Sequence, residues 1–292
     1  MKEKVVVIGG SGFLGSHLAD VLSESGFFVT IYDIRPSPWL RPDQEMVTGD
    51  IRDEMLLEKA LQKASYVYHL AGIADIGYAS RNPRETVETN ILGSTIIIEQ
   101  CIKAKIKRFL MASTMYVFSQ KGSFYRVSKQ AVELLLEAYS EKSALEYTIL
   151  RYGSLYGPRA QEWNSLKNFV NQAVKEGRIS YPGFGDERRE YIHVLDAAQM
   201  SVKALSPEYA NQRLILTGAQ ILNSKELTSM INEILGGGVK VEFYPENRDP
   251  AHYELTPYRM THRVAYKMVP EKFIDIGQGI LELIEELYDE KK

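Results

Sequence analysis

The sequence is poor in cysteine, in net charge and in long hydrophobic runs. Its single cysteine, Cys101, excludes an internal disulfide and lies in an apolar helical stretch, as a buried small side chain does. The formal net charge is −3, so no excess of one sign points to nucleic acid or an anionic membrane as partner. The apolar run at 5–8 is too short for a signal peptide or a membrane span. We therefore expect a cytoplasmic protein, and the histidines show no metal-ligand spacing.

What the sequence does contain is an alternation of short β-branched runs and amphipathic stretches through its first half. This alternation is typical of βαβ units and predicts a parallel sheet with helices on both faces. We expect strands at 4–8, 28–32, 46–48, 66–70, 108–112 and 147–151, and helices at 12–24, 54–63, 84–104 and 127–142.

A glycine-rich loop follows the first expected strand directly. Gly9, Gly12 and Gly15 recur every third residue and open the first expected helix, where backbone N–H groups suit a pyrophosphate. The alternative is a tight turn that only packs a helix on a strand. Asp33 follows the second expected strand, where a carboxylate holds the adenosine ribose and repels a 2′-phosphate. The loop therefore predicts a dinucleotide, NAD in preference to NADP, although Arg35 nearby would suit NADP.

Beyond residue 153 the alternation of strand-like and helix-like stretches becomes less regular, and glycine and proline become frequent. We expect a strand at 213–216, a helix at 224–235, a strand at 239–243 and a helix at 276–288. The predicted architecture is a Rossmann-type doubly wound α/β fold with a smaller C-terminal α/β substrate-binding lobe. Residues 1–155 and 190–220 would form the NAD-binding domain, and residues 156–189 and 221–292 the lobe.

The loop and Asp33 resemble those of the short-chain dehydrogenase/reductase superfamily, in particular its extended branch of UDP-glucose 4-epimerase-like nucleotide-sugar epimerases and dehydratases. The resemblance covers nearly the whole chain and rests on the segments GDIRD (49–53), HLAG (69–72), TNILGS (89–94), RYGSLYGPR (151–159) and REYIHVLD (189–196). It implies that Asp50 and Ile51 flank the adenine, that 69–72 lies beneath the cofactor, and that Asn90 steadies the active-site strand.

Tyr125 and Lys129 are four residues apart and therefore share one face at a helix start. A tyrosine with its unperturbed pKa of about 10 is a poor base at neutral pH, and we expect the ammonium of Lys129 and the positive nicotinamide to lower it. An amphipathic helix alone would also explain the pair, but a cofactor-binding half precedes it. The resemblance adds a third catalytic residue, a hydroxyl at the end of the preceding strand, which is Thr114 here with Ser113 as the fallback.

The residues expected to bind the cofactor are Gly9, Gly12, Phe13, Leu14, Gly15, Asp33, Asp50, Ile51, Leu70, Ala71, Gly72, Asn90, Tyr125, Lys129 and Tyr152. The residues expected to bind substrate are Thr114, Ser154, Arg189 and Arg248. The resemblance implies that Arg189 grips a nucleotide diphosphate and that Arg248 assists, since two guanidinium groups match a pyrophosphate in charge and geometry. The predicted partner is thus a nucleotide-diphosphate sugar.

The residues after Thr114 bear on the reaction. In relatives that dehydrate or decarboxylate the sugar, acidic residues follow the catalytic hydroxyl, whereas Met115 and Tyr116 follow here. This favours 4-epimerisation, in which the C4 hydroxyl is oxidised to a ketone and re-reduced on the opposite face. One alternative is an NAD(P)-dependent dehydrogenase or ketoreductase of a deoxysugar nucleotide or other hydroxyl compound. This alternative rests on Ser154, which replaces an asparagine of relatives, and on a short loop before Tyr125. The other is a catalytically inactive cofactor-binding scaffold.

Two further expectations concern assembly and a helix end. Relatives pair through the helices that correspond to 84–104 and 127–142, so the resemblance implies a homodimer. The apolar residues at 96–98 and 134–136 could equally be core. Asp196, just before two alanines, is expected to cap a helix.

Overall fold

The computed structural model describes residues 2–247, 250–258, 265–270 and 272–289. A large parallel sheet organises the first lobe. Its strands are β1 (Lys4–Ile8), β2 (Phe28–Asp33), β3 (Gln44–Thr48), β4 (Ala64–His69), β5 (Arg108–Thr114), β6 (Glu146–Tyr152), β10 (Gln212–Leu216) and β13 (Tyr266–Lys267). They run in the order β13-β10-β6-β5-β4-β1-β2-β3, every neighbouring pair parallel. The strand order reverses beside β1, and ligands of such sheets bind at the carboxyl ends of the strands there.

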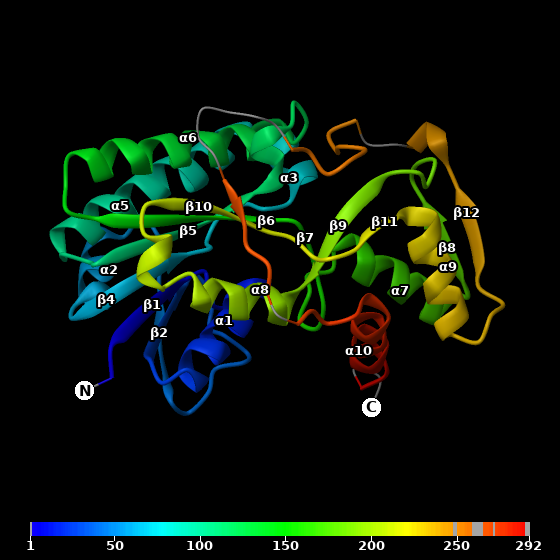
Figure 1. The fold of residues 1–292 in the computed structure, drawn as a ribbon, viewed down its shortest axis with the longest axis horizontal. Helices are drawn as coiled ribbons and strands as arrows, with labels where there is room; N and C mark the ends of the chain where they lie inside the picture. Colours follow the sequence, from blue (N-terminus) through cyan, green and yellow to red (C-terminus); the bar gives the residue numbers. More distant parts are fainter. Residues whose placement is uncertain (1, 248–249, 259–264, 271, 290–292) are drawn as a thin grey trace.

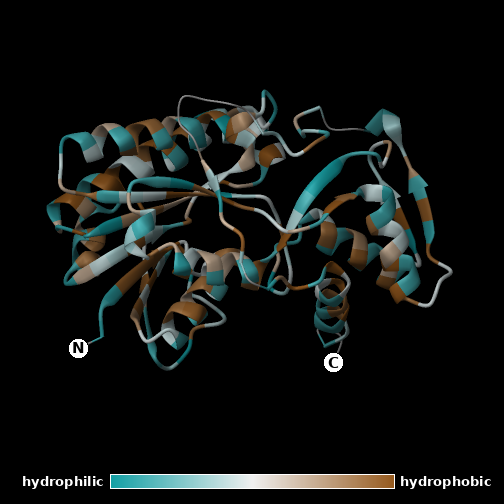
Figure 2. Cartoon of the chain, viewed as in Figure 1, coloured by the Kyte–Doolittle hydropathy of each residue, from teal (hydrophilic) through white to brown (hydrophobic). Residues whose placement is uncertain are grey.

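Helices cover both faces of this sheet (Figure 1). On one face lie α1 (Phe13–Glu24) and α8 (Val194–Lys203), and on the other α2 (Glu54–Leu61), α5 (Ser94–Lys103) and α6 (Ser123–Glu141). Strand β1 shows why: Val5 and Val7 belong to the first core, and Val6 and Ile8 to the second. Successive side chains of a strand point to opposite faces, so a strand buried on both faces is apolar throughout. Figure 2 shows this apolar centre between helices with polar outer faces.

A smaller lobe adjoins the large sheet and has its own core (Figure 1). It holds a three-stranded sheet of β7 (Ser154–Tyr156), β9 (Arg188–His193) and β11 (Ile221–Asn223), and a parallel pair of β8 (Arg178–Tyr181) and β12 (Lys240–Phe243). Its helices are α7 (Ser165–Glu176), α9 (Ser224–Ile234) and α10 (Ile276–Asp289). The remaining described elements are α3 (Ile76–Arg81), α4 (Pro83–Thr86), η1 (Val87–Gly93), η2 (Met115–Phe118), η3 (Pro207–Tyr209) and η4 (Pro245–Asn247).

The predicted α/β architecture is confirmed, and the errors lie in individual elements. The expected helix over 84–104 is helical throughout 83–103, but it is not uniform, because its middle, η1, is a π-helical turn between α4 and α5. Helix α6 begins at Ser123, earlier than expected, after Gly122 in the left-handed conformation (φ 98°). The expectation that Asp196 caps α8 is wrong: His193 is the N-cap, and Asp196 accepts a hydrogen bond from Ile274 instead.

The proposed division into two domains stays a prediction. Strand β13 lies in the stretch that we assigned to the smaller lobe, yet it pairs with β10 in the large sheet. In the described part of the chain, no helix has the length and apolar character needed to cross a membrane.

Candidate active site

The glycine loop joins β1 to α1 and is shaped by close backbone approaches. A Cβ atom on Gly9 would lie 2.4 Å from the backbone nitrogen of Ala71, and one on Gly15 would lie 2.1 Å from the carbonyl oxygen of Gly9. Glycine at these two positions is thus required by packing alone. Gly12 differs, because its Cβ would meet only the Gly9 oxygen, at 3.3 Å. The middle glycine is therefore the one whose absent side chain leaves room beside the loop.

The first turn of α1 presents backbone donors at this loop. Gly12 is the N-cap and provides no side-chain cap, and among the described residues no backbone oxygen accepts from the N–H of Phe13 or Leu14. A helix N-terminus with free N–H groups and a positive dipole end binds phosphate. The loop therefore fits the pyrophosphate of a dinucleotide.

Asp33 lies at the end of β2, beside the loop. One carboxylate oxygen accepts a hydrogen bond from the Ser11 backbone (3.0 Å) and the other from the Arg35 backbone (3.2 Å), and the Ser11 hydroxyl donates to the Arg35 carbonyl (2.8 Å). These bonds fix the carboxylate at the mouth of the loop. Its position suits the ribose role that we predicted.

The residues expected around the adenine and beneath the cofactor follow β3 and β4. Ile51 is buried against Gly93, whereas the Asp50 carboxylate is bound by the Arg52 guanidinium (2.6 Å). The backbone N–H groups of Leu70 and Ala71 donate to the carbonyl of Ile8, which holds this segment beside the glycine loop. The Asp50 carboxylate, which we expect to contact the adenine, is thus already engaged by Arg52.

Asn90 lies in the π-helical turn and makes three hydrogen bonds within the protein. Its amide donates to the Ile73 carbonyl (2.9 Å) and the Ser128 hydroxyl (3.0 Å), and its oxygen accepts from the Ile73 N–H (2.7 Å). A Cβ on Gly72 would also strike this side chain, at 2.8 Å. Asn90 therefore ties the segment after β4 to helix α6, and π-helical turns often occur at functional sites.

Helix α6 and strand β5 bring the three predicted catalytic residues together. Tyr125 lies in the first turn of α6, and the Lys129 Nζ is 5.9 Å from the centre of its ring and donates to the Ala112 carbonyl (2.9 Å). Thr114 is the last residue of β5, and its hydroxyl lies close enough to Tyr125 to lower the pKa of that phenol. The fallback Ser113 points to the opposite face, as strand alternation requires, and donates to Glu133 instead (2.5 Å). Thr114 is thus the hydroxyl that accompanies the pair.

Burial shifts the pKa values of both members of this pair. Burial raises the pKa of Tyr125 to about 12, and the nearby Thr114 hydroxyl, which lowers this pKa, offsets only part of the rise. Burial lowers the pKa of Lys129 to about 8, and the Glu133 carboxylate, which raises this pKa, offsets only part of the fall. In the protein chain without cofactor, the loss of solvation dominates the pKa of Tyr125. The expected lowering by Lys129 together with the positive nicotinamide stays a prediction.

Arg189 and a group of aromatic side chains adjoin the catalytic pair. The Tyr116 ring lies 6.3 Å from Tyr125 and 4.4 Å from Tyr253, between ring centres, and its hydroxyl is 2.7 Å from His252 Nδ1. The Arg189 guanidinium lies close to the Tyr116 hydroxyl, and its carbon is 5.0 Å from the Tyr253 ring centre. The structure thus places Arg189, from β9, on the far side of the Tyr116 ring from Tyr125, the predicted proton acceptor.

The other residues expected at the site are placed differently. Ser154 begins β7, next to Tyr191 of β9. Tyr152 is buried on the α8 side of the sheet, and its hydroxyl pairs with Ser201 at 2.6 Å. Arg248 lies outside the described residues.

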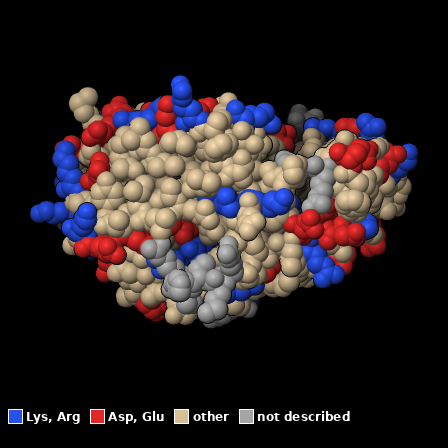
Figure 3. All heavy atoms as spheres, turned by 90° about the horizontal axis from the view of Figure 1, so that it is seen from above, with Lys and Arg blue, Asp and Glu red and all other residues tan. Residues whose placement is uncertain are grey.

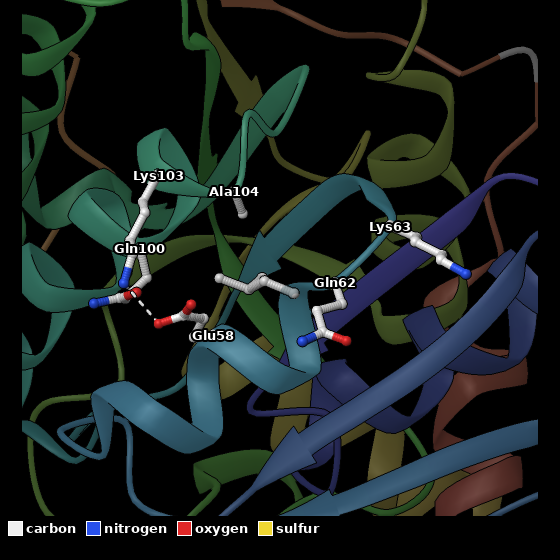
Figure 4. A pocket seen from close by; sticks show the side chains of 7 residues that line it. Glu58, Gln62, Lys63, Gln100, Lys103 and Ala104 are labelled. Atoms are coloured by element: carbon white, nitrogen blue, oxygen red, sulfur yellow. Dashed lines mark hydrogen bonds and ion pairs between the residues drawn. The ribbon is translucent and has the colours of Figure 1, made fainter.

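A cavity of about 340 Å³ lies elsewhere, between α2 and α5 (Figure 4). It is lined by Glu58, Leu61, Gln62, Lys63, Gln100, Lys103 and Ala104. These residues are at the ends of helices that lead into β4 and β5, and hence at the amino edge of the sheet. The predicted site is at the carboxyl edge, where ligands of such sheets bind.

A family model described as "NAD dependent epimerase/dehydratase family" matches residues 5–215. The chain belongs to this family. This confirms the resemblance that the sequence motifs indicated, and it confirms NAD as the cofactor.

Relatives within the epimerase/dehydratase family differ in their reactions. A putative UDP-glucose 4-epimerase of Methanocaldococcus jannaschii is 27% identical over 302 residues, which cover 96% of this chain and 97% of the relative. UDP-glucuronic acid decarboxylase 4 of Arabidopsis thaliana is 27% identical over 277 residues, 85% of this chain. The chain spans 61% of that relative's length. The family is therefore established, and the individual reaction is not.

Solved structures of the family share the fold. The crystal structure of UDP-glucuronic acid 4-epimerase from Bacillus cereus, in complex with UDP-glucuronic acid and NAD, superimposes with a TM-score of 0.86. It is 21% identical, and the match covers 98% of this chain and 99% of that one. The Rossmann-type architecture with a second lobe is thus that of the epimerase/dehydratase family.

Sequence reasoning missed three groups of residues near the site. Tyr116 was noted only for lacking a carboxylate, and the 250–258 segment with Tyr253 carried no motif. Glu133 could have been found, because it follows Lys129 by one helical turn on the same face. The segment around Tyr253 could not, because only the tertiary fold brings it against α6.

Proposed function

We propose that this protein is an NAD-dependent nucleotide-sugar epimerase that inverts the C4 hydroxyl. The observation that carries the proposal is the assembly of Tyr125, Lys129 and Thr114 at the carboxyl edge of the sheet. In the sequence, Thr114 is followed by Met115 and Tyr116 and not by acidic residues. Such a site has a proton acceptor and a hydroxyl donor for one sugar oxygen. It lacks the adjacent carboxylates that elimination of water or loss of carbon dioxide would use.

The residues of the chain divide the work on the sugar hydroxyl. Bound NAD supplies a reversible hydride acceptor. The Tyr125 oxygen takes the hydroxyl proton and later returns it, while Thr114 holds the same oxygen by a hydrogen bond. The Lys129 ammonium favours the phenolate through its charge. Because the proton and the hydride both return, the sugar is inverted without net oxidation.

Arg189 supports a nucleotide diphosphate as the remainder of the substrate. Its guanidinium lies beside Tyr116 and Tyr253, half-buried and close to Tyr125. A guanidinium in such a setting suits the paired oxygens of a diphosphate. With Arg248 assigned only from sequence, Arg189 is the residue on which substrate binding is proposed to depend.

A second candidate is an NAD(P)-dependent dehydrogenase or ketoreductase of a deoxysugar nucleotide. Ser154 favours it, because a hydroxyl replaces the amide that relatives use for the nucleotide sugar, so the substrate could differ. The same three catalytic residues would serve, and a second substrate would take up or supply the hydride.

Product analysis distinguishes the two candidates. The purified protein is incubated with individual UDP-hexoses, and both the sugar product and the absorbance of NADH are followed. Epimerised sugar without net NADH is the expected result. Stoichiometric NADH accumulation would instead establish the dehydrogenase. If neither a new sugar nor NADH appears, an inactive scaffold would be favoured.

Tyr125→Phe tests the catalytic assignment. Removal of the phenolic oxygen is expected to lower kcat by about 10²- to 10⁴-fold, because the proton acceptor is lost. Tyr139→Phe is the matched control on the same helix, since its hydroxyl bonds to Glu99 far from the site. Equal activity in the two variants would contradict the assignment.

The homodimer and the cytoplasmic location are proposals of the same kind. Val127 and Leu134 of α6 are 44% and 50% exposed, although both are large and apolar. The face above α6 is largely free of charged side chains (Figure 3). Such a face suits pairing with a second copy. The cytoplasmic location stays a prediction of the sequence.

A further inference from the structure

Behind the catalytic pair lies a buried ion pair that the proposed reaction does not use. The Arg151 guanidinium binds the Glu133 carboxylate by two hydrogen bonds, of 2.6 and 3.0 Å. The side chains are 5% and 7% exposed. The Phe118 ring lies 4.6 Å from the guanidinium carbon and covers it. A buried pair of this kind seldom adds stability over apolar side chains, so a role in function is worth seeking.

Three consecutive residues of β5 connect this ion pair to the catalytic site. The Ala112 carbonyl accepts a hydrogen bond from Lys129, the Ser113 hydroxyl donates one to Glu133, and the Thr114 hydroxyl lies close to Tyr125. In the sheet register Ser113 stands opposite Arg151 of β6. The carboxylate is therefore held by two adjacent strands, at the level where the catalytic hydroxyl leaves β5.

Helix α6 sets the carboxylate beside the catalytic ammonium. Tyr125, Lys129 and Glu133 are spaced by four residues and so lie along one face of the helix. The Lys129 and Glu133 residues are both buried, at 8% and 6% exposure. An ammonium removed from water loses its proton more readily unless an anion stands close to it.

We propose that Glu133 is a positioning residue that acts through Lys129: its buried carboxylate keeps the ammonium charged, and Arg151 and Ser113 hold the carboxylate in place. The role of this charge in turnover rests on the proposed function. The charge state of Lys129 does not, because it is a property of the folded chain.

Among the described residues, His69 and Tyr125 are the other titratable groups beside Lys129. Burial, and Lys129 itself, lower the pKa of His69 in β4 to about 3, so this imidazole is neutral at physiological pH. Tyr125 is a neutral phenol in the chain alone, since burial raises its pKa to about 12. The side chains of Asn90 and Ser128, which lie beside Tyr125, carry no charge at any pH at which the protein is folded. Glu133 and Arg151 are thus the charges that decide the balance at Lys129, whose own pKa burial lowers to about 8.

The test titrates Lys129 directly. The protein is labelled with [ε-¹³C]lysine, the Lys129 signal is assigned by its loss in Lys129→Arg, and its chemical shift is followed against pH. Glu133→Gln leaves Arg151 uncompensated, and the midpoint should fall by roughly one pH unit or more. Arg151→Met leaves the carboxylate uncompensated, and the midpoint should rise. The double variant should lie between them.

Glu137→Gln is the matched control, one helical turn further along α6. Its carboxylate is bound by Arg213 in a second ion pair. Its distance along the helix predicts an unchanged Lys129 midpoint. If Glu133→Gln does not fold, Arg151→Met still tests the sign. Equal midpoints in wild type, Arg151→Met and every folded variant of Glu133 would overturn the proposal.

The rate measurement separates this inference from the proposed function. In Glu133→Gln the alkaline limb of the epimerase pH profile should move down by the same interval as the Lys129 midpoint, with KM for the sugar nearly unchanged. A shifted midpoint in a protein that epimerises no UDP-hexose would sustain the role of Glu133 and refute the epimerase. A shifted midpoint with an unshifted rate profile would refute the action of Glu133 on turnover.

Discussion

Tyr125 and Lys129 are shifted by burial in opposite senses. The phenol is harder to ionise, with a pKa of about 12, and the ammonium easier, with a pKa of about 8. Both shifts have one cause, because an environment with little water disfavours whichever form carries charge. The spacing of the two residues in the sequence predicted the pair. The depth at which they lie could not be predicted, because it depends on the segments that cover them.

His69 predicts a loss of stability in acid. Burial lowers its pKa to about 3, whereas an unfolded histidine titrates near about 6.5. Between these values the unfolded chain binds more protons, so the free energy of unfolding falls as the pH drops below about 6.5. We expect a loss of up to about 1.4 kcal/mol per pH unit from this residue.

Thermal unfolding between about pH 7.5 and pH 5 measures this dependence. His69→Gln does not titrate and can keep a hydrogen bond to Ser94, the present partner at 2.7 Å. The variant should therefore show a flatter dependence of Tm on pH than the wild type. Parallel curves would show that other groups cause the acid lability.

At the scale of elements, α6 and η1 prepare the site together. Helix α6 carries Tyr125 and Lys129 on its inner face, and Asn90 of η1 binds Ser128 between them. Asn90 also holds Ile73, after β4, so the helix and the neighbouring segment are fixed as one unit. The periodicity of the sequence predicted both helical stretches. It did not reveal the π-helical turn, which changes the hydrogen-bond spacing without a clear signal in side-chain pattern.

The glycine loop allows folding and cofactor binding to be separated. Gly15→Ala would force a Cβ to 2.1 Å from a backbone oxygen, so α1 must move, at a cost of about 1–3 kcal/mol or more. Gly12→Ala meets that oxygen only at 3.3 Å and adopts an ordinary φ of −83°. It should fold normally and bind NADH at least about tenfold more weakly, because its methyl group occupies space that the pyrophosphate needs.

Urea unfolding and NADH fluorescence titration of the two variants measure these effects. A stable Gly12→Ala with full NADH affinity would show that the loop is only a packing turn. That outcome would support the alternative that the sequence left open.

At the scale of the whole molecule, residues from both lobes meet beside Tyr125 and Lys129, the predicted catalytic pair. The segment 250–258 binds Gly122 before α6 through the Ala251 carbonyl (2.7 Å) and Arg188 of β9 through Glu254 and Thr256. It places Tyr253 against both Tyr116 and Arg189. A substrate held by Arg189 would thus lie between the nucleotide-binding sheet and the smaller lobe.

The proposed dimer is tested by charge on its apolar face. Leu134→Glu places a carboxylate on the exposed side of α6 and should convert a dimer to monomers, because burying an unpaired charge is costly. NADH affinity should change little. Leu281→Glu, on α10 in the other lobe and 41% exposed, is the matched control. Light scattering coupled to size-exclusion chromatography measures the masses. Equal masses for wild type and Leu134→Glu would contradict the predicted interface.

The sequence by itself determined the class of fold and the cofactor, and it predicted the catalytic pair. These depend on local pattern: a buried apolar strand, glycines at a fixed spacing before a helix, and two side chains one helical turn apart. The tertiary structure alone decided which hydroxyl joins the pair, since Ser113 faces Glu133 and Thr114 faces Tyr125. It also decided that Arg189 and Tyr253, distant in sequence, reach the same site. The reason is physical: burial and contacts between distant segments fix these choices, and neither is written in the spacing of neighbouring residues.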